Sequence, residues 1–381
     1  MTALDEALLE RIRGRAADYD RRNAFPAEDL AELQQAGYLR PRPLAEVVAD
    51  QRRLAASAPA TALAVNMHLV WVGVARVLAE RGDDSLAWVL AEAEAGELFA
   101  FGISEPGNDQ VLWDAATRAE RATVNGEPGW AFTGLKVFTS LAPAWTRLGV
   151  FGRAETEDGP RLVHGFIDRA ADGTEFAPAP GVTHLDDWDA LGMRASQSRS
   201  TRLDGAFVPD GRVARILPVG PNADPFVFGV FTNFLLGLAS VYAGIADRAM
   251  ELAVEAVQRR TSLRTGKRYA DDPDFRWRIA DMALALDPLE YELTTLARAV
   301  DEQADYGATW FRRLTGAKHR ATETARVVVD QALRASGGGS FRADAELTRL
   351  QRDVLAGIYH PSDTESIHAT IAGAILGPIA P

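Results

Sequence analysis

The chain contains no cysteine, so disulfides, thiolate nucleophiles and thiolate metal ligands are excluded. Its six histidines include no HxH or HExxH pair, and we therefore expect no metal site. Basic residues are outnumbered, with 41 Lys and Arg against 53 Asp and Glu and a net charge of −12, which argues against nucleic acid or an anionic membrane as the main partner. We find no signal-peptide pattern and no apolar run that is long and uncharged enough to span a bilayer. These absences predict a soluble, cytoplasmic protein without a membrane span.

Two kinds of pattern alternate along the 381 residues. Residues 3–98 and residues 224–381 carry apolar side chains at helical spacing. Residues 117–210 form short segments rich in Val, Phe, Thr and Trp, and Asn125-Gly126 between two of them predicts a β-hairpin. The chain therefore contains a β-region between two helical regions.

We expect an α+β fold with three domains. They are an N-terminal helical domain (residues 1–100), a middle β-barrel or β-sandwich domain (residues 101–222) and a C-terminal four-helix bundle (residues 223–381). The bundle is predicted because its long helices are joined by short turns.

Residues 102–109 hold two glycines, Pro106 and short polar side chains, which is the composition of a turn. Ser104, Asn108 and Asp109 could bond a ligand or their own main chain. Without further context, an ordinary surface loop is the simpler interpretation.

Further motifs supply that context. Five segments match motifs of one family in the same order. Residues 103–109 (ISEPGND) match its T/S-E-P-G…D turn, residues 134–140 (GLKVFTS) match its N-G-x-K-x-[WF]-[IT]-[TS] strand, and residues 191–196 (LGMRAS) with Val208-Pro209 match its L-G-x-R-x-S…VP segment. Residues 260–263 (RTSL) match its R-x-x-F-G segment, and residues 337–339 (GGG) with Arg352-Asp353 match its GG-x-G…RD segment. On these motifs the chain resembles the acyl-CoA dehydrogenase superfamily of flavoproteins along essentially its full length. The first turn is shorter than the family's by a glycine and a serine, which normally border the pantetheine channel.

The resemblance implies a flavin cofactor, FAD or, in the monooxygenase branch of the family, FMN. Ser104 and Ser140 would contact the pyrimidine edge of the ring, and Phe138 would stack beside it. The simpler interpretation of Phe138 is a core aromatic, but its position between Lys136 and Ser140 favours the flavin.

The resemblance also implies a homo-oligomer, a dimer or tetramer, with the flavin near the subunit interface. Arg260 and Ser262 match residues that reach the FAD of a neighbouring subunit, and Gly337 and Gly338 match the turn beside its pyrophosphate. Otherwise Arg260 would belong to a solvated helix end and the glycines to a bare cap.

The family's catalytic base is missing from both of its usual positions. His360 stands where most members have a glutamate, and residues 232–235, the other usual place, contain no acid. Three interpretations remain: His360 is an acid or base, it merely caps the last helix or fills space, or Asp363 or Glu365 acts as the base. We predict His360 as the catalytic residue.

These features leave three functional hypotheses. The first is an FAD-dependent oxidoreductase that acts on the CH–CH group of an acyl or acyl-CoA-like small molecule, with an electron-transfer flavoprotein as partner. The second is a two-component flavin-dependent monooxygenase that takes reduced flavin from a reductase and uses O2. The third is an inactive flavoprotein scaffold. The sequence does not identify the substrate, although residues 170–187 are a candidate pocket loop.

Overall fold

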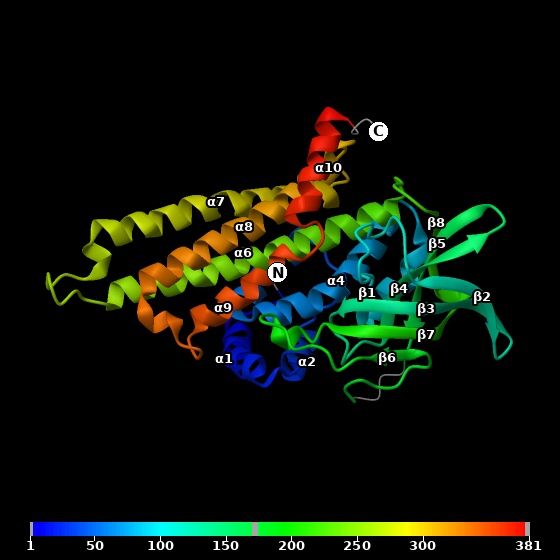
Figure 1. Cartoon of the computed structure of the whole chain (residues 1–381), viewed down its shortest axis with the longest axis horizontal. Coiled ribbons are helices and arrows are strands. Elements are labelled where there is room, and N and C mark those ends of the chain that lie inside the picture. The colour runs from blue at the N-terminus through cyan, green and yellow to red at the C-terminus, as the bar shows by residue number, and fades with distance from the viewer. Residues whose placement is uncertain (1–2, 170–173, 378–381) are drawn as a thin grey trace.

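The computed structural model describes residues 3–169 and 174–377 (Figure 1). Its N-terminal region is helical: α1 (Glu6–Arg22), α2 (Ala27–Gln35), α3 (Leu44–Ser57), α4 (Pro59–Ala79), the 3-10 turn η1 (Asp84–Leu86) and α5 (Ala87–Glu94). The side chain of Asp5 caps α1 by accepting a hydrogen bond of 2.7 Å from the Leu8 amide. Helix α4 is buried on nearly every face, as its uninterrupted apolar sequence requires.

The strands follow, and all those in the described part of the chain belong to one sheet. They are β1 (Phe99–Gly102), β2 (Arg118–Val124), β3 (Glu127–Thr139), β4 (Arg147–Thr156), β5 (Gly159–Asp168), β6 (Val182–His184), β7 (Arg199–Pro209) and β8 (Val213–Pro218), with 3-10 turns η2 (Arg194–Ser196) and η3 (Asp210–Arg212). The order across the sheet is β6-β7-β3-β2-β4-β5-β8, and β1 pairs with β4 in parallel. Strand β1 was not predicted, because a short strand that is buried on both faces shows no alternation.

The predicted hairpin is confirmed. Val124 on β2 pairs with Glu127 on β3, and Asn125 and Gly126 between them have φ angles of 52° and 84°. Positive φ at both turn positions is what a two-residue hairpin loop requires.

The sheet also curves over, so that strands far apart in its order come close. A Cβ atom placed on Gly165 of β5 would lie 2.7 Å from Cγ1 of Val208 on β7. Glycine is therefore needed at position 165 for this close packing.

The C-terminal region is again helical. It contains α6 (Pro225–Arg259), η4 (Tyr269–Asp271), α7 (Pro273–Asp301), α8 (Thr309–Ser336), η5 (Gly338–Phe341), α9 (Glu346–Val354), η6 (Leu355–Ile358) and α10 (Thr364–Leu376). Helices α6, α7 and α8 run alongside one another, and the sheet lies at one end of them (Figure 1). The domain boundaries given above stay a prediction.

The expectation that no apolar run is long and uncharged enough to span a bilayer was wrong on length and composition. Helices α4 and α6 are long and apolar enough to cross a membrane by length and composition. Their most apolar windows are 89% and 83% buried inside the protein, so both helices pack as core elements here. A buried helix and a membrane span share the same composition, and only tertiary packing separates them.

Candidate functional site

A cavity of about 500 Å³ lies where the three regions of the chain meet. Leu63 and Met67 of α4, Phe101 of β1 and Phe234 of α6 form an apolar wall. The rings of Phe101 and Phe234 are stacked, with centroids 5.5 Å apart. The remaining walls come from the turn after β1, the end of β3, residues 188–198 and the segment from η6 to the start of α10.

The turn after β1 is organised by the buried carboxylate of Glu105. Its Oε1 accepts hydrogen bonds from the Thr117 amide at 2.8 Å and from Lys136 Nζ at 2.7 Å. Its Oε2 accepts from the Ala116 amide at 2.7 Å and from Asn108 Nδ2 at 2.8 Å. Burial by itself would raise the pKa of Glu105, but Lys136 and the amide donors outweigh it and hold that pKa well below its usual range. Glu105 therefore stays ionised and fixes the turn.

Ser104 lies in the same turn and lines the cavity. Its carbonyl accepts a 2.9 Å hydrogen bond from the Val137 amide, which attaches the turn to β3. The structure thus places Ser104 beside the strand that carries the other predicted flavin contacts.

Phe138 is not a core aromatic. The pairing of β3 with β7 is irregular between Lys136 and Thr139, and Phe138 has a left-handed φ of 57°. The residue is 57% exposed and lines the cavity, and its ring packs edge-to-face with Trp188, with centroids 6.3 Å apart. Phe138 thus lies at an irregular point of the strand and on the lining of the cavity.

Three hydroxyls form a chain behind this wall. Ser140 Oγ lies 2.7 Å from Ser198 Oγ, which lies 2.7 Å from Ser196 Oγ. Ser140 and Ser198 line the cavity, and Ser196 is buried. Each hydroxyl has one proton to donate, so Ser198 can donate to only one of its two neighbours. If Ser196 donates to Ser198 and Ser198 donates to Ser140, the hydroxyl proton of Ser140 is available to a ligand.

The Arg352-Asp353 motif holds another wall of the cavity. Asp353 Oδ1 accepts a 2.7 Å hydrogen bond from the Met193 amide, and Arg352 donates to the Leu191 carbonyl at 2.9 Å and pairs with Asp20. Burial raises the pKa of Asp353 to about 6.

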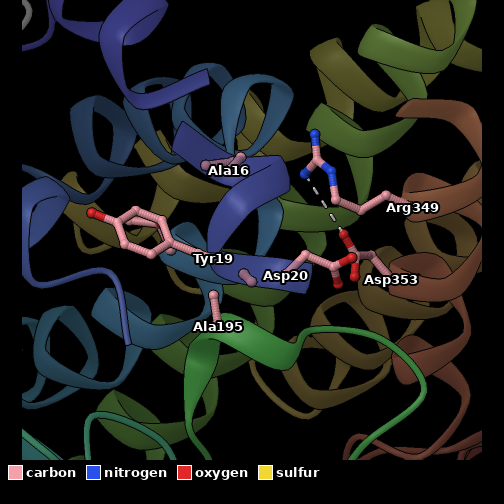
Figure 2. Close-up of a pocket in the computed structure, with 9 residues that line it drawn as sticks. Ala16, Tyr19, Asp20, Ala195, Arg349 and Asp353 are labelled. Carbon is pink, nitrogen blue, oxygen red and sulfur yellow. Dashed lines mark ion pairs between the residues drawn. The ribbon is translucent and has the colours of Figure 1, made fainter. Parts of the chain in front are cut away.

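Beside Asp353 lies a second, very small cavity (Figure 2), lined by Ala16, Tyr19, Asp20, Ala195 and Arg349 among others. Arg349 Nη1 is 4.0 Å from the Asp353 carboxylate. The cavity volume is about 10 Å³, space for about one water molecule. We therefore assign the motif to holding residues 191–193 and not to binding a ligand here.

His360 lies on the wall of the main cavity, between η6 and α10. Its Nδ1 is 2.9 Å from the hydroxyl of Tyr242 on α6. Burial, assisted by the charge of Lys318, lowers the pKa of His360 to about 3, so the imidazole is neutral near pH 7. A neutral imidazole with so low a pKa is a weak base at that pH.

The backbone around His360 is held by a buried lysine. Lys318 Nζ, from α8, donates to the carbonyls of Gly357 at 2.9 Å, His360 at 2.8 Å and Ser362 at 2.9 Å. These three bonds use all three ammonium protons. The sequence analysis missed Lys318. Its signal is the position itself, because 318 shares a buried helical face with Leu314.

The carboxylates proposed as substitutes for the missing base are differently placed. Asp363 lines the cavity, but its Oδ1 caps α10 by accepting a 2.8 Å hydrogen bond from the Ser366 amide. Burial would raise the pKa of Asp363, and the bond to Ser366 and the charge of Lys318 lower it overall. Glu365 is exposed and does not line this cavity. Neither geometry favours a base.

Comparison with known proteins gives the family. Residues 236–362 match the family described as "Acyl-CoA dehydrogenase, C-terminal domain". L-evernosamine nitrososynthase from a Micromonospora species is 30% identical over 92% of this chain and 83% of its own length. The chain belongs to the acyl-CoA dehydrogenase superfamily.

Two further relatives agree. The putative acyl-CoA dehydrogenase YdbM of Bacillus subtilis is 27% identical over 96% of this chain and 94% of its own length. The structure of KijD3 in complex with FMN and dTDP-3-amino-2,3,6-trideoxy-4-keto-3-methyl-D-glucose has a TM-score of 0.82 and 25% identity, covering 98% of this chain and 92% of KijD3. The predicted superfamily, the α+β fold and the class of flavin-dependent oxidoreductase are confirmed.

The remaining predicted residues of the superfamily site lie far from the cavity. Arg260 donates to the carbonyls of Ala335 at 3.3 Å and Ser336 at 2.5 Å, and packs against Gly337. Ser262 and Gly338 belong to the turns that follow α6 and α8, outside the cavity lining. Arg260 follows the last residue of α6 and is 26 positions beyond Phe234, roughly 39 Å at 1.5 Å per residue. One chain therefore does not bring this group to its own cavity.

The described part of the loop at residues 170–187 does not line the main cavity. Residues 170–173 lie outside the described residues, and the described part, with Pro178 and His184, borders a separate hollow of about 350 Å³. Trp145 Nε1 donates to His184 Nε2 at 2.8 Å, and His184 Nδ1 is 2.9 Å from Thr201 Oγ1. Both ring nitrogens of His184 are thus used within the β-region. Across the described residues, no group of three His, Asp or Glu side chains could hold a metal ion.

Proposed function

We propose that this chain is a flavin-dependent monooxygenase that uses reduced flavin and O2. The observation that carries the proposal is the placement of His360, held by Tyr242 and Lys318 where most of the superfamily has its base. No carboxylate among the described cavity residues is both buried and uncommitted, because Glu105 is locked in its turn and Asp363 caps a helix. Proton removal from an acyl substrate therefore lacks an evident base.

The hydrogen bond to Tyr242 sets the role of His360. The Tyr242 hydroxyl bonds no other group among the described residues, and in our proposal it donates its proton to Nδ1 of His360. The neutral imidazole then carries its own proton on Nε2, and its ring lines the cavity. In our proposal His360 donates a hydrogen bond to a group in the cavity.

The cavity residues fit a flavin ring. Phe138 and Trp188 supply exposed aromatic surface, and Ser104 and Ser140 supply polar groups on the adjoining wall. Bound flavin would supply two-electron chemistry and, when reduced, the activation of O2. FMN is bound in the KijD3 complex, and both FMN and FAD remain candidates for this chain. The cytoplasmic location stays a prediction.

The alternative function is oxidation of a CH–CH group in an acyl-CoA-like substrate. It is favoured by one residue that could serve as the missing base. Asp109 lines the cavity, is exposed and has no partner among the described residues. An electron-transfer flavoprotein would be the partner in that case, whereas the monooxygenase needs a flavin reductase.

Reduced FMN delivered by a reductase is expected to bind the protein and be reoxidised by O2 at a rate that differs from free reduced FMN. Butyryl-CoA is expected to leave the flavin absorbance unchanged without oxygen. Replacing His360 by alanine should shift the reoxidation rate toward that of free flavin, because the Nε2 donor is lost. Anaerobic bleaching by butyryl-CoA would support the dehydrogenase instead, and an unchanged rate in the variant would make His360 structural.

Replacing Arg260 by alanine is expected to weaken FMN and FAD binding roughly tenfold or more, because a cation near the phosphate of a neighbouring subunit's flavin is lost. Riboflavin, which has no phosphate, should bind the variant and the unchanged protein alike. Arg259→Ala is the matched control, because Arg259 is exposed on the last turn of α6. Equal loss of riboflavin and FMN affinity would contradict a phosphate contact. A homo-oligomer, a dimer or tetramer, is part of this proposal.

A further inference from the structure

The charges around the main cavity constrain what enters it. Among its described lining residues, three are carboxylates, Glu105, Asp109 and Asp363, and one is a cation, Arg352. Glu105 is paired with Lys136 at 2.7 Å. The two remaining carboxylates have no cation within ion-pair distance among the described residues.

The single lining cation is already engaged. Both terminal nitrogens of Arg352 bond the carboxylate of Asp20, and one of them also donates to the Leu191 carbonyl at 2.9 Å. The nearby ammonium of Lys318 is committed to three backbone carbonyls. Neither group is available to a ligand without breaking bonds that hold the cavity walls.

The inner wall is apolar. Leu63, Met67, Phe101 and Phe234 face the cavity with no polar group among them, and Ile358 extends this surface toward His360. Such surface binds apolar groups by excluding water. A phosphate placed beside it would lose hydration without gaining a positive partner.

We infer that the substrate is an uncharged, largely apolar molecule that carries no phosphate. This inference rests on the flavin-enzyme function proposed above and narrows it. It sets this chain apart from CoA thioesters and from the nucleotide sugar in the KijD3 complex, which all carry phosphates. His360 is a polar contact in the same cavity lining, where its Nε2 proton can bond an acceptor on such a molecule.

Indole, butyryl-CoA and dTDP are suitable probes for calorimetric titration of the assembled, FMN-loaded protein. Indole is expected to bind at least tenfold more tightly than either phosphate ligand. Phe234→Ala should weaken indole binding roughly tenfold by removing an aromatic contact, whereas Phe228→Ala on the same helix should not, because Phe228 is outside the lining. Tighter binding of butyryl-CoA or dTDP, or no binding of indole, would overturn the inference.

A charge reversal tests the electrostatic argument directly. Asp109→Lys places a cation at the cavity wall and is expected to lower the Kd of dTDP roughly tenfold at low salt. Gln110→Lys also introduces a lysine, with a charge change of +1 where Asp109→Lys gives +2, at an exposed position that does not line the cavity, and it should change the Kd little. If neither variant improves dTDP binding, charge does not control ligand choice and the inference is wrong.

These titrations use oxidised flavin and no turnover. Binding of indole in a protein that shows no altered reoxidation of reduced FMN would leave the substrate inference standing and remove the monooxygenase proposal. Tight binding of dTDP in a protein that does alter the reoxidation of reduced FMN would remove the substrate inference and leave the monooxygenase proposal standing.

Discussion

Replacing Lys136 by methionine is expected to lower the free energy of unfolding by about 3–5 kcal/mol, because it leaves the Glu105 carboxylate buried without its cation. Lys136 is fully buried, and its ammonium also donates to the Phe151 carbonyl at 2.8 Å. Urea denaturation of the flavin-free protein, followed by tryptophan fluorescence, measures the loss.

Two comparisons identify the cause of that loss. The double variant Lys136→Met, Glu105→Gln should lose less stability than the sum of the two single variants, because it leaves no unpaired charge. Lys267→Met, at an exposed position, should change stability by less than about 0.5 kcal/mol. Additive losses in the double variant would mean that the ion pair is not the source.

Replacing Lys318 by methionine is expected to alter flavin reoxidation as much as His360→Ala does, because the ammonium holds the backbone that carries His360. The double variant Lys318→Met, His360→Ala should then be no worse than His360→Ala alone. Flavin binding should persist, since Ser104, Phe138 and Ser140 lie on another wall. An unchanged reoxidation rate in Lys318→Met would contradict this role.

A second measurement separates this role from a loss of folding. Removing the positive charge of Lys318 should raise the pKa of His360, which NMR titration of labelled histidines can follow in flavin-free protein. Asp363 and Glu323 are the acidic groups that act on Lys318, and Tyr242 is the other group that contacts His360. Lys318→Arg should restore little, since a flat guanidinium does not match three carbonyls around one nitrogen.

The two predictions share a feature of composition. Three of the 41 basic residues are lysine, Lys136, Lys267 and Lys318, and two of these three are buried. An ammonium is compact and has three donors, so it fits a small polar site that a guanidinium would not. Scarce lysine in an arginine-rich chain was a signal that the sequence analysis did not use.

The sequence by itself determined the order of helices, sheet and helices, because helical and strand periodicities are local properties of the chain. Its motifs also predicted the superfamily, which comparison confirmed. They singled out Ser104, Phe138, Ser140 and His360, and the structure places these four residues on one cavity. The flavin contacts assigned to these residues stay predictions. Motifs succeeded here because each one lies within a single turn or strand.

Only the tertiary structure decided what those residues do together. Burial and the charge of Lys318 lower the pKa of His360, and Tyr242 contacts its Nδ1. Tyr242 and Lys318 are 118 and 42 positions away in the chain. Likewise, the guanidinium of Arg352 bonds the carboxylate of Asp20, 332 positions earlier in the chain, and is therefore not available to a ligand. Burial and the distance to charged or hydrogen-bonding partners determine the protonation state of a side chain and which of its donors and acceptors stay available to a ligand. The local spacing of residues in the sequence encodes neither.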